Sequence, residues 1–369
     1  MVFTILKLFN RYITSVYLIS MKNRFQIMLL LILLVPAILL GQTKIESIEE
    51  IQLKTIQPGT VSQFWLHLTD DGMSQPVYVP VIIAKGKTTE PVLGLTAAIH
   101  GNELNGIRII QRVFEELDLE TLEGTIIGIP GLNTISIPNH ERRFIDEEDL
   151  NRNFPGKENG NRSQQYVYQI NKKILSQLDY LIDMHTASFG RTNTLYVRAD
   201  MENDATKTMA LLQDADIILN NKGVPSADEK IAATHTMRAE AMLQGIPAIT
   251  IEYGDPQVYQ TDMIERGKIG VENVLSWLKM TPQKITPVGD QVICKKSYWI
   301  FLDKGGYLEV PVELNQLVKK GELIGRLRNP FGDIIQDYYC PEDGIVIGRS
   351  SNPVNMSGGR IIHLGILNN

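Results

Sequence analysis

VLGLTAAIHGNELNGIRII, residues 92–110, joins a strand pattern to a helix pattern and decides the fold of the surrounding chain. Residues 93–99 are apolar and few enough for a buried strand, a Gly-Asn pair interrupts them, and helical spacing begins at Leu104. His100 and Glu103 therefore fall on a strand-to-helix turn. An imidazole and a carboxylate so spaced can bind one Zn2+ if a third ligand comes from elsewhere. An ordinary polar turn is the alternative for this stretch alone.

Strand-like and helix-like segments alternate on both sides of this stretch. The pattern predicts an α/β domain over residues 75–281, with a mainly parallel or mixed twisted sheet flanked by helices, and residues 42–74 are assigned to a lead-in. Strands are expected at 77–84, 92–99, 125–129, 180–184, 194–197, 217–219 and 248–251, and helices at 104–117, 162–177, 203–213, 237–244 and 263–280. Sites in such sheets gather at the carboxyl ends of strands.

Two more of these strand ends carry side chains suited to metal chemistry. His185 follows the predicted strand 180–184 and would complete a three-ligand zinc site with a fourth position free for water. Asp183 could orient its imidazole. Glu252 ends the run 247–251, where a carboxylate beside a metal can act as general base and pass the proton to a leaving amine. Taken singly, each of these residues has a structural role as its alternative.

The segment between the two histidines, residues 139–156, is polar and irregular. Asn151 and Arg152 lie side by side, and an amide next to a guanidinium suits a substrate carboxylate. Arg143 could polarise the scissile carbonyl and stabilise the oxyanion. A solvated charged loop is the alternative.

The first 41 residues have the pattern of an export signal. Lys22 and Arg24 precede the apolar run 27–40, which is about as long as a signal-peptide core and short for a membrane span. Gly41 offers a small residue for cleavage, and Met21 is a plausible alternative start to Met1. We predict export to the periplasm or the exterior. An uncleaved anchor, which would be the protein's one attachment to the membrane, is the alternative.

Composition excludes several classes of protein. The 369 residues are 43% hydrophobic, which is ample for a packed core. The net charge is −6, and removing residues 1–41, which hold four bases and no acid, makes it −10. Phosphate binding needs a concentrated basic face, so nucleic acid is not expected as a partner. Cys294 and Cys340 are too few for a disulfide scaffold, and the sequence does not show whether they pair.

Four motifs together resemble one known family. HGNELNG, RFIDEEDLNRNFPG, DMHTASFGR and GIPAITIEYG occur in the order and approximate spacing of the succinylglutamate desuccinylase/aspartoacylase family, relatives of the zinc carboxypeptidases. The resemblance covers roughly residues 75–369. It implies zinc ligands at His100, Glu103 and His185, a catalytic carboxylate at Glu252, substrate-carboxylate binding by Asn151 and Arg152, and a carbonyl-polarising Arg143. The spacing from Arg143 to Asn151 is one residue longer than in the family, so Arg142 stays open as the alternative.

Two arginines farther along the chain are weaker candidates. Arg191 lies six residues after His185 in a glycine-containing loop, and is assigned to substrate binding as a specificity determinant. Arg238 lies near the start of a predicted helix before the Glu252 strand, and the nearby His235 is interpreted as structural.

Residues 282–369 change to short β-prone segments separated by glycine, which indicates a small barrel or sandwich. The pattern resembles the biotinyl/lipoyl-like β-domain that ends many members of the family, without the lysine of a modified carrier. It would close one side of the pocket or mediate homo-oligomerisation, and its residues do not decide between these roles.

The sequence thus predicts a zinc-dependent hydrolase, with one Zn2+ per chain, that cleaves the amide bond of a small N-acyl amino acid or related amide by metal-activated water. A carboxypeptidase-like hydrolase of exported peptides or cell-wall fragments is one alternative. A non-catalytic zinc- or ligand-binding protein is another. The acyl group and the amine are left open.

Overall fold

The computed structural model describes residues 45–223 and 234–367. The predicted export segment, residues 1–41, lies outside these ranges, and export stays a prediction. None of the helices within the described ranges has the length and apolar content needed to cross a bilayer.

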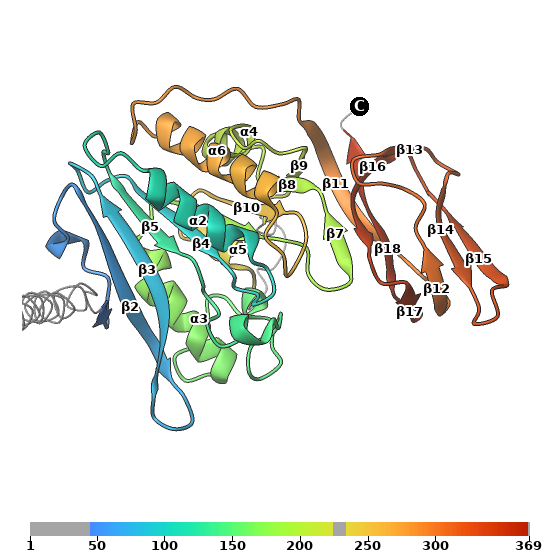
Figure 1. The fold of residues 1–369 in the computed structure, drawn as a ribbon, viewed down its shortest axis with the longest axis horizontal. Coiled ribbons are helices and arrows are strands. Elements are labelled where there is room, and N and C mark those ends of the chain that lie inside the picture. Colours follow the sequence, from blue (N-terminus) through green and yellow to red (C-terminus); the bar gives the residue numbers. More distant parts are fainter. Residues whose placement is uncertain (1–44, 224–233, 368–369) are drawn as a thin grey trace, which may run out of the picture. The chain divides into compact units, whose positions relative to one another are not determined.

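Helices and strands alternate through the first two thirds of the described chain, and strands alone follow (Figure 1). The helices are α2 (Asn105–Glu116), α3 (Arg162–Lys173), α4 (Asp204–Leu211), α5 (Met237–Leu243) and α6 (Thr261–Trp277), with short 3-10 turns at Leu53–Thr55, Ile137–Asn139, Leu150–Arg152 and Leu175–Gln177. The earlier strands are β1 (Glu46–Ile48), β2 (Thr60–Asp70), β3 (Pro76–Lys85), β4 (Val92–Ala97), β5 (Thr125–Ile129), β6 (Tyr180–His185), β7 (Arg191–Asn193), β8 (Leu195–Ala199), β9 (Ile217–Asn220) and β10 (Ala248–Tyr253). The later strands are β11 (Val292–Phe301), β12 (Gly306–Glu309), β13 (Leu317–Val318), β14 (Leu323–Arg328), β15 (Ile334–Tyr339), β16 (Gly344–Ser350), β17 (Val354–Asn355) and β18 (Arg360–Leu367).

A mixed sheet of fourteen strands organises the fold, in the order β1-β2-β3-β5-β4-β6-β10-β8-β9-β11-β18-β16-β13, with β7 paired to β16. At its centre β5, β4, β6 and β10 are parallel. All six residues of β4 are buried, as expected for a strand covered on both faces, which reads as a continuous apolar run. The predicted α/β fold class is confirmed.

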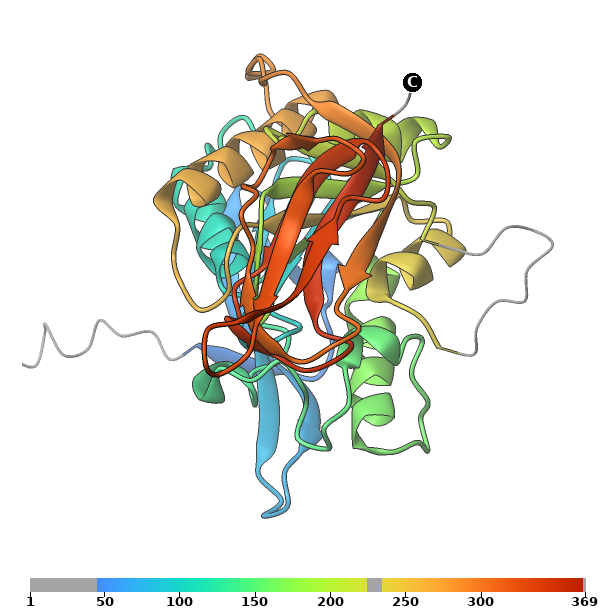
Figure 2. The same ribbon diagram turned by 90° about the vertical axis from the view of Figure 1, so that its right-hand side faces the viewer.

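Helices cover both faces of this sheet (Figure 2). On one face α2, α4 and α6 contribute Ile109, Met209 and Val271 to one hydrophobic cluster. On the other, α3 and α5 contribute residues such as Tyr166 and Met237 to a second cluster. The central strands are packed between the two clusters. The carboxyl ends of these strands therefore form a rigid edge of the sheet.

The C-terminal strands divide between two sheets. β11, β18, β16 and β13 extend the large sheet through the parallel pairing of β11 with β9, while β15, β14, β12 and β17 form a separate sheet. The predicted all-β end of the chain is therefore present, but it shares hydrogen-bonded strands with the α/β part. Cys294 and Cys340 are buried and unpaired.

One expectation from the sequence differs from the structure. Strand β2 lies inside the stretch assigned to a lead-in and forms a long hairpin with β3. Its apolar residues Phe64, Leu66 and Leu68 alternate with more exposed neighbours, because the strand lies near the sheet edge. This alternation has the period of two typical of a half-exposed strand, but the apolar Trp65 between Phe64 and Leu66 interrupts the apolar-polar pattern in the sequence.

Candidate active site

The parallel strands β4, β6 and β10 end at the same edge of the sheet and bring three candidate residues together. His185 is the last residue of β6, and Glu252 lies opposite it in the register of β10. His100 follows β4 by three residues, on a turn that passes close to the backbone of Ser136. A Cβ atom at Gly101 would lie 2.4 Å from that backbone, so glycine is needed where the turn begins.

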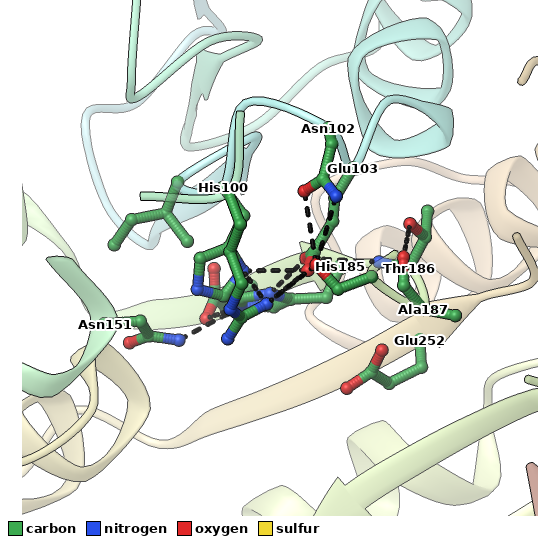
Figure 3. A network of polar contacts seen from close by, with 12 residues as sticks. His100, Asn102, Glu103, Asn151, His185, Thr186, Ala187 and Glu252 are labelled. Atoms are coloured by element: carbon green, nitrogen blue, oxygen red, sulfur yellow. Dashed lines mark hydrogen bonds and ion pairs between the residues drawn. The ribbon is translucent and has the colours of Figure 1, made fainter. Parts of the chain in front are cut away.

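His100, Glu103 and His185 form one buried cluster, and their side chains point toward one another (Figure 3). One ligand atom from each lies within 4.8 Å of the others. Glu103 Oε1 is 2.9 Å from Nδ1 of His100, and Glu103 Oε2 is 2.8 Å from Nδ1 of His185. The three residues that the sequence singled out from two distant segments therefore meet.

The Nε2 atom of each imidazole, on the side of the ring away from Glu103, contacts a second carboxylate. Nε2 of His185 is 2.8 Å from Asp183 Oδ2, and Nε2 of His100 is 2.9 Å from Asp149 Oδ1. A neutral imidazole that donates its proton through Nε2 has a lone pair on Nδ1. Both Nδ1 lone pairs then point at the Glu103 carboxylate, so two nitrogen acceptors and one carboxylate converge on one place. This is the arrangement of metal-ligating histidines, in which a carboxylate fixes the tautomer and orients the ring. The donor set thus fits a divalent cation. Asp183 was expected in this role, and Asp149 was not.

The pKa values of the cluster reflect the same convergence. Burial alone would raise the pKa of Glu103, but His100 and His185 outweigh it and hold that pKa far below its usual value. Burial would lower the pKa of His185, but Asp183 and Glu103 outweigh it and raise that pKa well above its usual value. The lowered pKa keeps the Glu103 carboxylate ionised, and the raised pKa of His185 reflects the negative potential that Asp183 and Glu103 create at its ring, where a positive charge is favoured.

Arg142 supplies a positive charge at this place. Its Nη1 donates to Glu103 Oε1 at 2.8 Å and to Ser188 Oγ at 3.2 Å, and its Nη2 donates to Asp149 Oδ2 at 2.8 Å. These bonds hold the guanidinium over the cluster, with 28% of the side chain exposed.

The structure corrects the position expected for the site arginine, because Arg143 does not reach the cluster. Its side chain is 61% exposed, and its contact with Glu147 is a long 3.9 Å. Ser136 Oγ donates to the Arg143 carbonyl, and the next residue, Phe144, is buried in the core, so the backbone turns the Arg143 side chain toward solvent. Arg142, the alternative that the sequence left open, lies in the site instead.

The predicted substrate-binding residues line a cavity of about 380 Å³ beside the cluster. Asn151 is buried, and its Oδ1 accepts from the Met237 backbone N–H at 2.8 Å. Arg152 donates to the Asn151 carbonyl at 2.7 Å. Arg191 lies with its guanidinium 5.9 Å from the ring centre of Trp299, a residue of the C-terminal strand β11.

The cavity is strongly cationic. Five arginines line it, namely Arg142, Arg152, Arg191, Arg198 and Arg238, against two acids, Glu103 and Glu252. From the sequence, Arg238 is a weak candidate, and neither Arg198 nor Trp299 is predicted as a site residue. The arginine of β8 becomes a wall residue only because β8 pairs with β10, an adjacency that no local signal in the sequence reveals.

Glu252 stands at the wall of this cavity, next to His185 (Figure 3). Its Oε2 accepts from Asn193 Nδ2 at 3.3 Å, and its Oε1 is 3.8 Å from Arg198 Nε. Its side chain keeps 14% of its surface exposed, so the carboxylate can reach a ligand in the cavity.

Comparison with known proteins gives consistent results. The family model described as "Succinylglutamate desuccinylase/Aspartoacylase catalytic domain" matches residues 89–278. The N-alpha-acetyl-L-2,4-diaminobutyric acid deacetylase of Halomonas elongata is 24% identical over 295 residues, which is 76% of this chain and 83% of that protein.

Solved structures share the fold. The product-bound ectoine utilization protein EutE (DoeB) from Ruegeria pomeroyi superimposes with a TM-score of 0.75 at 20% identity, covering 85% of this chain and 98% of that one. A succinylglutamate desuccinylase/aspartoacylase from Rhodobacter sphaeroides gives a TM-score of 0.75 at 19% identity, covering 87% of this chain and all of that one.

Proposed function

The chain belongs to the succinylglutamate desuccinylase/aspartoacylase family of deacylases, and from that premise we propose that it is a zinc-dependent hydrolase of N-acyl amino acids. One observation carries the proposal: two imidazoles, each held by a carboxylate through Nε2, direct Nδ1 at Glu103. Nitrogen and oxygen donors in this number are typical of catalytic zinc sites. When bound by His100, Glu103 and His185, zinc would supply Lewis acidity to a water molecule and to the acyl carbonyl.

The chain's own residues account for the remaining chemistry. Glu252 accepts a proton from the attacking water and returns it to the leaving amine, a role that needs a carboxylate within reach of both. Arg142 donates to the carbonyl oxygen as negative charge develops there. Hydrogen bonds to the Glu103 and Asp149 carboxylates hold its guanidinium in position. Asn151 and Arg152 bind the α-carboxylate of the amino acid through an amide and a guanidinium.

The charge of the cavity indicates which N-acyl amino acids fit. The α-carboxylate engages one or two of the five arginines and leaves Arg191, Arg198 and Arg238 to face the rest of the substrate. Arg238 is buried and donates to the carbonyl and the side chain of Asn221, but among the described residues it forms no ion pair with a carboxylate. Burial lowers its pKa to about 10, so a cation without a carboxylate partner is costly there. We therefore propose a substrate with a second carboxylate. A compound with a free amino group, such as the one in the name of the Halomonas relative, is disfavoured here.

The proposal is tested by metal analysis and a substrate panel. The purified protein should contain about one zinc per chain and release amine from N-acetyl or N-succinyl derivatives of aspartate and glutamate faster than from N-acetyl-diaminobutyrate, N-acetyl-leucine or dipeptides. Glu252→Gln should keep zinc and lose about 10²–10⁴-fold in kcat, because the proton shuttle is removed. Glu158→Gln, at an exposed position, is the matched control. Full activity in Glu252→Gln, or preferential cleavage of dipeptides, would refute the assignment.

A further inference from the structure

The loop that follows His185 is held by a strand from the far end of the sequence. Strand β7 in this loop pairs with β16, so that Asn193 lies opposite Gly348 and Arg191 lies opposite Ser350. Backbone bonds from Ser351 N–H to the Gly190 carbonyl, 2.9 Å, and from Thr194 N–H to the Ile347 carbonyl, 3.0 Å, extend the pairing at both ends. The C-terminal segment therefore fixes the backbone of a cavity-lining loop.

Asn193 connects this pairing to Glu252. The residue is buried at 7% exposure, and its Nδ2 donates to Glu252 Oε2 at 3.3 Å. Its Oδ1 has no hydrogen-bond partner within the part of the chain that the structure describes. Reversing the amide would set Oδ1 against the Glu252 carboxylate, two acceptors facing each other, so the charge of Glu252 selects the observed orientation.

Glu252 depends on this donor for its orientation. Arg198, which forms an ion pair with Glu252, is 3.8 Å away, too far for a hydrogen bond, and therefore adds charge without fixing a direction. Among the described residues, Asn193 makes the one hydrogen bond recorded for the Glu252 side chain. We propose that Asn193 is a positioning residue for Glu252, and that β16 of the C-terminal segment sets its place. This inference rests on the proposed function of Glu252 as the proton-transfer group.

Gly348 is the point at which β16 controls the amide. A Cβ atom there would lie 2.4 Å from Asn193 Oδ1 and 3.0 Å from the Thr192 carbonyl. The first distance is shorter than any tolerable contact, so a methyl group would push the amide away. Gly348 is not itself among the cavity-lining residues, so its replacement acts on the cavity only through the loop that carries Asn193.

The test combines Asn193→Ala and Gly348→Ala with the Glu252→Ala variant in the full-length protein. Asn193→Ala should lower kcat about tenfold, the effect of losing one hydrogen bond to a charged group, with KM and zinc content unchanged. Gly348→Ala should lower kcat in the same direction in the wild type and have no further effect in Asn193→Ala. Neither change should lower the residual rate of Glu252→Ala, because residues that act through Glu252 lose their effect with it. Gly289→Ala, where a Cβ meets nothing within 4 Å, is the matched control.

Several results would overturn the inference. A raised KM with unchanged kcat in Asn193→Ala would make the residue a substrate contact. Additive losses in the Glu252→Ala background would indicate a structural role, and wild-type kcat in Gly348→Ala would remove the link to β16. Lack of wild-type turnover on the whole panel would refute the proposed function and this inference with it, whereas an active wild type with an unimpaired Asn193→Ala refutes this inference alone.

Discussion

Replacing Arg142 by alanine should abolish most of the activity, while the same change at the adjacent Arg143 should not. Arg142 makes two charge-assisted hydrogen bonds of 2.8 Å, to Glu103 and Asp149, which preorganise its guanidinium before substrate arrives. Loss of one preorganised donor to a developing oxyanion lowers kcat about 10²–10³-fold, or about 3–4 kcal/mol in the barrier. Arg143 is 61% exposed with its nearest carboxylate at 3.9 Å, so its removal should change stability by no more than about 0.5 kcal/mol.

The assay is steady-state kinetics on the best substrate of the panel, at saturating zinc, with zinc content and thermal unfolding measured for each variant. Saturating zinc matters because Arg142 contacts the proposed ligand Glu103. Arg142→Lys should recover only part of the loss, since lysine keeps the charge but not the two-pronged donor. Equal kcat in the two alanine variants, or a larger loss at Arg143, would refute the assignment of Arg142 to the carbonyl.

Further expectations concern the metal, a second carboxylate and acid stability. Dialysis against a chelator should remove activity, and zinc should restore it and raise the melting temperature, as for any ligand that binds only the folded state; an active chelated protein would contradict the metal assignment. Asp183→Asn should weaken zinc affinity about 10–100-fold in a competition titration, because the His185 ring loses its carboxylate acceptor. Burial, with Arg198 and Arg191 nearby, lowers the pKa of His363 to about 3, below the value of about 6.5 in the unfolded chain. The unfolded state therefore binds the proton first, so stability should fall below pH 6.5 by up to about 1.4 kcal/mol per pH unit, and His363→Gln should flatten this slope in urea unfolding at pH 4.5–6.5. Identical slopes in both proteins would contradict the buried neutral imidazole.

The central strands and the three-residue cluster were predictable because their signals are local. Apolar runs such as 93–99 end at a polar residue, and parallel strands place such ends at one edge, so His100 and His185 had to lie near each other once the fold class was right. The position of an irregular loop is not fixed in this way. Arg142 and Arg143 are adjacent, and the burial of Phe144 decides which of them faces the cluster. That packing is a property of the folded core, which the local sequence does not contain.

Site residues that come from distant parts of the chain could not be predicted from the sequence for a related reason. Asp149 lies 49 residues from His100, and nothing in its surroundings distinguishes it from the neighbouring acids. Trp299 and Gly348 belong to a segment that the sequence marked as a separate small domain, and they matter because its strands continue the large sheet. Long-range strand pairing therefore set the limit of what could be inferred.

The carboxylates in contact with the two imidazoles determine which ionic charge this cluster favours. Glu103, Asp149 and Asp183 bring three negative charges, and Arg142 returns one positive charge, while the two rings stay uncharged when they coordinate through Nδ1. The groups in direct contact with the two rings and Glu103 thus carry a surplus of two negative charges. A doubly charged ion balances this surplus, whereas a sodium or potassium ion leaves half of it unbalanced beside the buried side chains of His100, Glu103 and His185. The site therefore favours divalent over monovalent ions before ligand geometry adds a further preference.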